Sequence, residues 1–70
     1  MNKVVLDWNG QLIDYGIEVY NSIGQVVKTD EARNVSKKEI QMGSLANGNY
    51  FIVMKDAEGN SGVIKVTVNK

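Results

Sequence analysis

The amino-acid sequence predicts an all-β fold, an antiparallel sandwich or small barrel of six or seven short strands. Three observations support this prediction. Apolar residues recur with a period of two, turn-forming residues separate most of the apolar runs, and no stripe of helical period is present. Because 70 residues suffice for one domain at most, we expect residues 1–70 to form a single β-sandwich domain.

The N-terminal segment contains two short strand candidates. Residues 4–6, Val-Val-Leu, form the first candidate, and Leu12-Ile13 form the second. Residues 8–10, Trp-Asn-Gly, lie between them, and Asn-Gly is a strong turn signal. We therefore expect two separate short strands before the clearer pattern that begins at Gly16.

Residues 17–28 have the pattern of a β-hairpin. Ile17 and Val19 alternate with polar residues and are expected to share one face of the first strand. Residues 21–24, Asn-Ser-Ile-Gly, follow as a tight turn, because Asn suits its first position and Gly its last. Residues 25–28 then return as the partner strand.

The middle of the chain is more polar. Residues 29–36 carry one short apolar side chain and one Val among polar residues, so we expect an exposed loop. Residues 37–42 alternate again, with Ile40 and Met42 facing inward. Leu45 is isolated in a turn-rich stretch, and we expect it to close one end of the core.

The C-terminal third predicts a second hairpin. Residues 50–54 are the most apolar run and are expected to form a central strand. Residues 56–60 form its loop, with a Gly that allows positive φ. Residues 63–68 form the closing strand. Its two predicted faces carry Ile64, Val66 and Val68 on one side and Lys65 and Thr67 on the other.

The charge distribution excludes several classes of partner. Eight Lys and Arg residues balance eight Asp and Glu residues, and they are scattered along the chain. A nucleic-acid-binding domain would show a basic stripe, and a membrane-surface segment a polybasic cluster. The apolar run 4–6 ends at Asp7, so we expect neither a secretory signal nor a membrane-inserted segment in this chain.

The residue types also argue against an enzyme. The chain contains no Cys and no His, which excludes disulfides, the usual zinc sites and nucleophile–base pairs that depend on either residue. We therefore expect no catalytic residue, no metal and no cofactor. The stability of a chain of this size without a disulfide or a structural metal depends on its small apolar core, or on association with a partner.

Three weaker candidate sites have simpler structural interpretations. The oxygen-rich loop 56–60 lacks the six to eight oxygen ligands that calcium takes, so a hairpin loop is favoured there. Asp7 and Asp14 could form a carboxylate pair, but a chain this short has little room for a cleft. Trp8 and Tyr15 could anchor a sugar or a partner, although packing in the core is favoured.

The edge strands lack one common protection against pairing with another chain. The sequence contains no Pro, so edges must be guarded by Lys and Glu side chains. The strongly apolar hairpin 50–68 makes strand pairing with another chain an expectation, and a homodimer through exposed edge strands is one form of it.

Two segments together resemble a known family. The first, residues 17–27, contains Tyr-Asn-x-x-Gly-Gln, and the second, residues 45–53, contains Leu-x-x-Gly-x-Tyr-Phe. A Lys-containing strand ends the chain at Lys70. In their order, spacing and distance from the C-terminus these motifs resemble the C-terminal sorting domain (type A) of proteins exported by the bacterial type IX secretion system. The resemblance covers residues 17–70, whereas the segment 1–16 matches the family poorly.

The resemblance implies a fold, a function and a set of site residues. The fold is a small immunoglobulin-like antiparallel β-sandwich. The function is that of a non-catalytic sorting module, which directs a fused passenger protein through the periplasm to the cell surface or the medium. The implied partners are secretion-machinery proteins of the outer membrane. The residues carried over by motif are Tyr20, Asn21, Gly24, Gln25, Leu45, Gly48, Tyr50, Lys65 and Lys70.

Alternatives remain beside this interpretation. A ligand- or carbohydrate-binding sandwich and a structural spacer of a surface protein would share the same fold. The immunoglobulin-like domain of flagellar hook-capping proteins has a similar hairpin, but its Trp-Asp-Gly motif lies in mid-chain, whereas Trp8-Asn9-Gly10 lies near the start. We also expect Met1 to be a cloning start of an excised domain.

Overall fold

The computed structural model describes residues 3–70, and these residues form six β-strands and no helix. All strand pairs are antiparallel. The all-β prediction is thus confirmed, and the expectation for Met1 lies outside the described residues. In chain order the strands are β1 Lys3–Asp7, β2 Ile13–Asn21, β3 Val26–Val35, β4 Lys37–Gln41, β5 Gly48–Lys55 and β6 Ser61–Val68.

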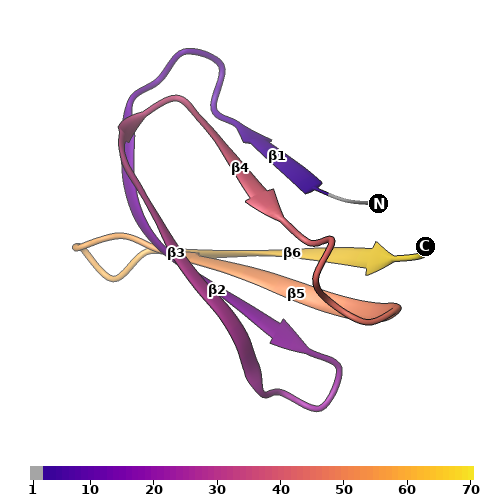
Figure 1. The fold of residues 1–70 in the computed structure, drawn as a ribbon. Helices are drawn as coiled ribbons and strands as arrows, with labels where there is room; N and C mark the ends of the chain where they lie inside the picture. Colours follow the sequence, from indigo (N-terminus) through magenta and orange to yellow (C-terminus); the bar gives the residue numbers. More distant parts are fainter. Residues whose placement is uncertain (1–2) are drawn as a thin grey trace.

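The strands form two sheets that pack as a small sandwich. The larger sheet has the order β3-β2-β5-β6, and β1 pairs with β4 in the smaller one. Figure 1 shows the two sheets as layers, with both termini at the same end of the molecule. β5 lies between β2 and β6, so the prediction that residues 50–54 form a central strand is confirmed.

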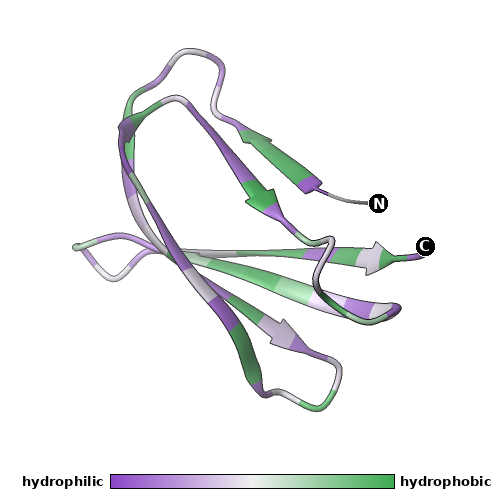
Figure 2. Ribbon diagram, viewed as in Figure 1, coloured by the Kyte–Doolittle hydropathy of each residue, from purple (hydrophilic) through white to green (hydrophobic). Residues whose placement is uncertain are grey.

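The core lies between the two sheets and draws on both. Figure 2 shows apolar residues along most of β1 and much of β5, whereas β4 is mostly hydrophilic with one apolar stretch towards its end. The fully buried side chains with the largest volume are Ile17, Ile40, Met42, Ile52, Val19 and Val68. The predicted inward positions on the first hairpin, on residues 37–42 and on the closing strand are therefore confirmed, except that Ile64 is only partly covered.

One predicted strand does not exist as a separate element. Leu12 precedes β2 and is exposed, while Ile13 begins β2 and is buried. β2 then runs without interruption to Asn21, so the expectation of a separate strand at Leu12-Ile13 is wrong. Gly16 does not break the strand, since its backbone pairs with Glu31 on one side and Lys55 on the other.

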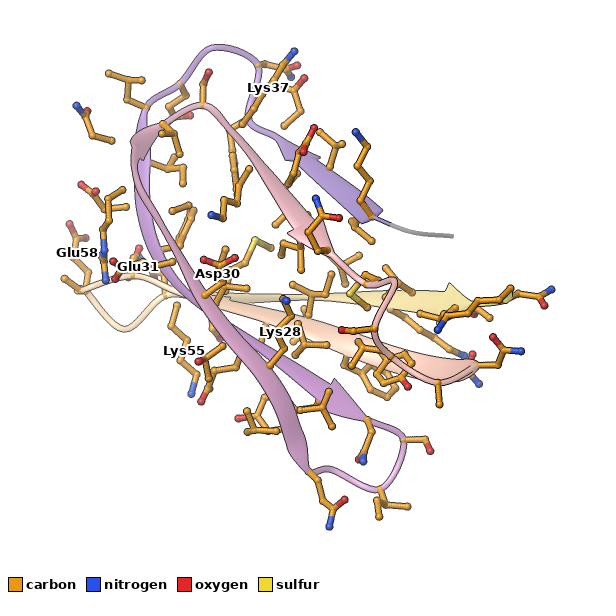
Figure 3. The ribbon with its side chains drawn as sticks, in the orientation of Figure 1. Lys28, Asp30, Glu31, Lys37, Lys55 and Glu58 are labelled. Atoms are coloured by element: carbon orange, nitrogen blue, oxygen red, sulfur yellow. The ribbon has the colours of Figure 1, made fainter. Side chains whose placement is uncertain are left out.

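The predicted loop at residues 29–36 is also wrong, because β3 continues to Val35. Its inward positions are Lys28, Asp30 and Ala32, which pair with the inward residues of β2. Figure 3 shows Lys28 and Asp30 projecting to one side of β3 and Glu31 to the other. Two of these three inward side chains are charged, so the strand has no apolar alternation for sequence analysis to detect.

An ion pair explains how a charged residue can face inward on β3. Asp30 lies 3.2 Å from the ammonium group of Lys38 on β4, and both side chains are largely covered. Partial burial would raise the pKa of Asp30, but the hydrogen bonds from the Glu31 amide and from Lys38 outweigh it and hold that pKa below its ordinary value. The pair joins the two sheets on the side where β3 continues into β4.

The corner between β3 and β4 also connects to β1. The backbone N–H of Trp8 donates to the carbonyl of Ser36 over 2.9 Å. This hydrogen bond extends the β1–β4 pairing, and this side of the sandwich is closed by the continuous chain from β3 to β4 and by the ion pair. The opposite side, where β1 and β6 form the edges of their sheets, has no such connection among residues 3–70.

Candidate recognition surface

The first family motif builds the turn between β2 and β3. The side-chain oxygen of Asn21 accepts the N–H groups of Ile23 and Gln25, and its amide donates to Oε1 of Gln25 over 3.1 Å. The N–H of Gly24 donates to the carbonyl of Asn21, and Gly24 has φ +83°. The predicted turn is confirmed, and three motif residues contribute to the fold by forming it.

The loop between β5 and β6 repeats this geometry with different residues. Asp56 takes the place of Asn21, and its Oδ1 accepts the N–H groups of Glu58 and Asn60. The side-chain amide of Asn60 donates to Oδ2 of Asp56, so this bond runs from the fifth residue to the first, opposite in direction to the bond from Asn21 to Gln25. Gly59 has φ +87° and takes the place of Gly24. The predicted hairpin loop is confirmed, and the two hairpin loops of the large sheet have the same backbone hydrogen bonds.

Tyr20 is the first-motif residue that the turn does not explain. Its hydroxyl group donates to Oε1 of Glu18 over 3.0 Å, and this hydrogen bond raises the pKa of Tyr20. Tyr20 pairs with Phe51 on β5, and Phe51 pairs with Lys65 on β6. Paired residues share a face, so these three side chains form a row across the outer face of the large sheet.

The second family motif builds the entry to β5. The hydroxyl group of Tyr50 donates to the carbonyl of Ala46 over 2.6 Å, while the Tyr50 ring is buried. Gly48 has φ +155°, a conformation that other residues rarely adopt. Leu45 packs half-buried against the core, which confirms its predicted place at the end of the sandwich. These three residues therefore shape and close one end of the molecule.

Two asparagines of this segment hold the end of the chain. Oδ1 of Asn47 accepts the N–H of Lys70 over 3.0 Å, and Oδ1 of Asn49 accepts the hydroxyl of Thr67 over 2.9 Å. Sequence analysis recognised only a turn-rich stretch here and missed both contacts, as it missed the place of Phe51. The signal available was the pair of Asn residues that flank Gly48 within the motif.

Lys65 and Lys70 differ from most other cations of the described chain. Five of the eight basic side chains form ion pairs, namely Lys3, Arg33, Lys37, Lys38 and Lys55. Lys65 and Lys70 are exposed and form no ion pair with a carboxylate of residues 3–70. Their ammonium groups are therefore free to meet a carboxylate on another molecule.

The weaker candidate sites have structural roles. Asp7 accepts the N–H of Asn9 in the turn that follows β1, and Asp14 on β2 accepts the N–H of Asn34 on β3, so each carboxylate stabilises nearby backbone. Trp8 packs against Tyr15, with ring centroids 5.8 Å apart, and both rings rest on the core. The favoured packing interpretation of these aromatic residues is confirmed. Within residues 3–70, no three His, Cys, Asp or Glu side chains gather as a metal site would require.

Comparisons with known proteins give one match. The secretion system C-terminal sorting domain family matches residues 1–69, a range that includes the segment 1–16 in which no family motif was recognised. No curated protein and no solved structure matches the chain. No helix of the described chain has the length and apolar character needed to cross a membrane.

Proposed function

The chain belongs to the family of C-terminal sorting domains of the type IX secretion system. From this premise we propose that it is a non-catalytic sorting signal. In this proposal a passenger protein fused before the domain reaches the periplasm, and the outer-membrane machinery then recognises the domain. The passenger finally reaches the cell surface or the medium. The family match over nearly the whole chain carries this proposal.

In this proposal the motif residues form two groups. One group stabilises the fold, and the secretion machinery recognises the other. Asn21, Gly24 and Gln25 act through the hairpin turn. Leu45, Gly48 and Tyr50 act through the end of the core, where their contacts stabilise the fold. Their substitution should therefore impair export only as far as it impairs folding.

The residues that we propose the secretion machinery recognises are Lys65, Lys70 and Tyr20. Lys65 and Lys70 are exposed and have no carboxylate partner among residues 3–70. Tyr20 stands in the same outer-face row as Lys65, with Phe51 between them. A row with an unpaired cation at one end and aromatic rings beside it is a surface that a protein partner can recognise.

An export assay tests the proposed function. Residues 1–70 are fused to the C-terminus of a fluorescent protein that is directed to the periplasm, in a bacterium with the type IX system and in a mutant without it. We expect reporter at the cell surface or in the medium of the competent strain only, and a decrease in size would reveal cleavage. Reporter that stays in the periplasm of both strains would reject the sorting function and leave a binding or spacer domain.

A deletion of residues 65–70 is unsuitable for this purpose. Val66 and Val68 are buried on β6, and their removal takes apolar side chains out of the core. Such a deletion would abolish export by unfolding the domain. Point substitutions of the exposed lysines keep β6 intact and therefore separate recognition from folding.

A further inference from the structure

The two edges of the large sheet are built very differently. β3 carries four charged residues, Lys28, Asp30, Glu31 and Arg33, and its pairing with β2 is interrupted by two register shifts. β6 has eight residues with Lys65 as its one charged residue, and its pairing with β5 is regular from end to end. Charges and irregular pairing protect an edge from further strands, so β3 is protected and β6 is not.

The unprotected edge of β6 adjoins an apolar cleft. The cleft has a volume of about 180 Å³ and lies on the side of the sandwich between β1 and β6. We call it the seam cleft. Its lining is Val5, Leu6, Asp7, Trp8, Met54 and Ile64. A second hollow of about 140 Å³ shares Trp8 and Met54 with it, so the apolar surface continues towards Tyr15.

Exposed apolar side chains surround the seam cleft. Val5 and Ile64 line the cleft from regular strands and are 51% and 36% exposed, and Val63, on the outer face of β6 beside Ile64, is 62% exposed. The free edges of β1 and β6 carry backbone N–H and C=O groups that no strand of residues 3–70 pairs. A ligand that binds at the seam cleft and the free strand edges must therefore supply both apolar side chains and a row of backbone hydrogen bonds. A polypeptide segment in extended conformation supplies both.

From these observations, and resting on the sorting function proposed above, we infer that the machinery recognises the domain by strand addition: an extended segment of the partner pairs with the free edge of β6 and places apolar side chains in the seam cleft. This partner segment becomes a fifth strand of the large sheet. Because β6 and β1 flank the cleft, the added strand would also close the open side of the sandwich.

The register of β6 specifies the residues that the added strand needs. Ile64 and Val66 pair with core residues of β5 and face inward, so apolar residues are required opposite them. Val63 and Lys65 face outward beside Val53 and Phe51. An apolar residue fits opposite Val63, and an Asp or Glu opposite Lys65 would neutralise a cation that lacks a partner within residues 3–70.

The same pattern disfavours a second copy of this chain as the occupant. Antiparallel pairing of β6 with β6 near its centre would bring the two Lys65 side chains close together. Like charges at opposing positions destabilise a strand pair. The inferred occupant is thus a segment of the secretion machinery with alternating apolar residues and a carboxylate.

Three Lys substitutions in the export reporter test the site. Ile64→Lys places a charge in the seam cleft and should reduce surface reporter by about tenfold or more, since an unpaired charge in an apolar contact is costly. Val27→Lys is the matched control, because Val27 is 40% exposed on the opposite edge strand. Val53→Lys tests the outer face of β5, which strand addition leaves open. The Val27→Lys control should export within about twofold of the unsubstituted domain.

A charge reversal gives a second test that does not depend on the core. Lys65→Glu should reduce export, since it would face the partner's carboxylate, whereas Lys37→Glu on the small sheet should not. Thermal melting of each purified domain shows whether it is folded. If Ile64→Lys unfolds the domain, Val5→Lys takes its place, because Val5 lines the same cleft and is half-exposed.

The outcomes separate this inference from the sorting function. Failure of the unsubstituted domain to export rejects the sorting function itself. Normal export of folded Ile64→Lys, or of Lys65→Glu, overturns strand addition but keeps sorting. Loss of export in folded Val53→Lys with normal export of Ile64→Lys would move the site to the outer face. A dimer in sedimentation equilibrium that Ile64→Lys abolishes would make a second copy the occupant and overturn the inferred partner.

Discussion

Tyr50 and Tyr20 both belong to the family motifs, yet their hydroxyl groups have different surroundings. The Tyr50 hydroxyl bonds to the backbone of Ala46 at the end of the core, whereas the Tyr20 hydroxyl bonds to the side chain of Glu18 on the outer face. A family motif therefore contains residues of both kinds, and only the contacts distinguish them. Sequence analysis could place Tyr50 in a central strand but could not identify its hydrogen-bond partner.

We expect Tyr50→Phe to destabilise the domain by about 1 kcal/mol, because the carbonyl of Ala46 loses its donor in a partly buried place. Urea unfolding at neutral pH measures the change. Tyr20→Phe is the control and should change the unfolding free energy by less than about 0.5 kcal/mol, since its hydroxyl has a side-chain partner near solvent. Equal losses in both variants would contradict the distinction drawn between the two tyrosines.

Asp56 is expected to make the stability depend on pH. Burial alone would raise the pKa of Asp56, but hydrogen bonds from Asn60, Glu58 and Gly59 outweigh it and lower that pKa. A lowered pKa in the folded state contributes stability above the ordinary Asp value of 3.8, and this contribution is lost as the pH falls through the folded value. The unfolding free energy should therefore decrease from about pH 5 to pH 2.

Asp56→Asn isolates this contribution, because Asn21 performs the same role in the other hairpin. We expect the variant to keep the loop and to show a smaller decrease in unfolding free energy between neutral and acid pH. Part of the decrease should remain, since the pKa of Asp30 is also lowered in the folded state. Identical pH profiles for the two proteins would show that Asp56 contributes nothing to acid sensitivity.

At the scale of elements, the two hairpin loops are equivalent structures. Both place a side-chain oxygen at the first position, a Gly with positive φ at the fourth and an amide side chain at the fifth. Sequence analysis predicted both loops correctly, because turn chemistry is encoded locally. Their shared backbone hydrogen bonding was not evident, since Asn-Ser-Ile-Gly-Gln and Asp-Ala-Glu-Gly-Asn share one residue, the Gly.

Gly24→Ala and Gly59→Ala should each destabilise the domain by about 1 kcal/mol, because Ala is strained at positive φ. No atom outside the neighbouring residues lies within 4 Å of the added methyl group at either position, so the effect is one of backbone conformation. Gly62→Ala is the control, with ordinary φ and the nearest atom at 3.7 Å. A cost for Gly62→Ala as large as for the loop glycines would contradict this reasoning.

β3 shows where an element escapes prediction from sequence. Its inward positions hold Lys28 and Asp30, and Asp30 is compensated by Lys38 from another strand. Nothing in the local pattern reveals that compensation, because the two residues meet only after both sheets have formed. The outer-face row of Tyr20, Phe51 and Lys65 escaped for the same reason, since it depends on the register of three strands.

At the scale of the whole molecule, the small sheet depends on few side chains. β4 places Ile40 against the core with no exposed surface, and β1 contributes Leu6. A domain of this length has a small reserve of stability. Each buried side chain of the small sheet therefore represents a large share of the free energy of folding.

Ile40→Ala should destabilise the domain by about 2–5 kcal/mol, enough to unfold much of the protein at room temperature. Circular dichroism during thermal melting measures the loss. Ile23→Ala is the control, because Ile23 is 76% exposed at a loop and should change the unfolding free energy by less than about 0.5 kcal/mol. A cooperative transition for Ile40→Ala at the temperature of the unsubstituted domain would show that the small sheet contributes little.

The measurement that tests the central claim most directly is export and stability of one double variant, Lys65→Ala with Lys70→Ala. The claim is that the secretion machinery recognises the exposed lysines of the C-terminal segment, whereas the turn and core motifs affect export only by stabilising the fold. Lys3→Ala with Lys37→Ala is the matched control, since both lysines are exposed on the small sheet.

We expect the Lys65 and Lys70 variant to keep its unfolding free energy within about 0.5 kcal/mol and to leave the reporter in the periplasm. The control should export normally, because its two surface ion pairs contribute little. Normal export of the Lys65 and Lys70 variant would contradict the claim and show that the machinery reads another part of the domain.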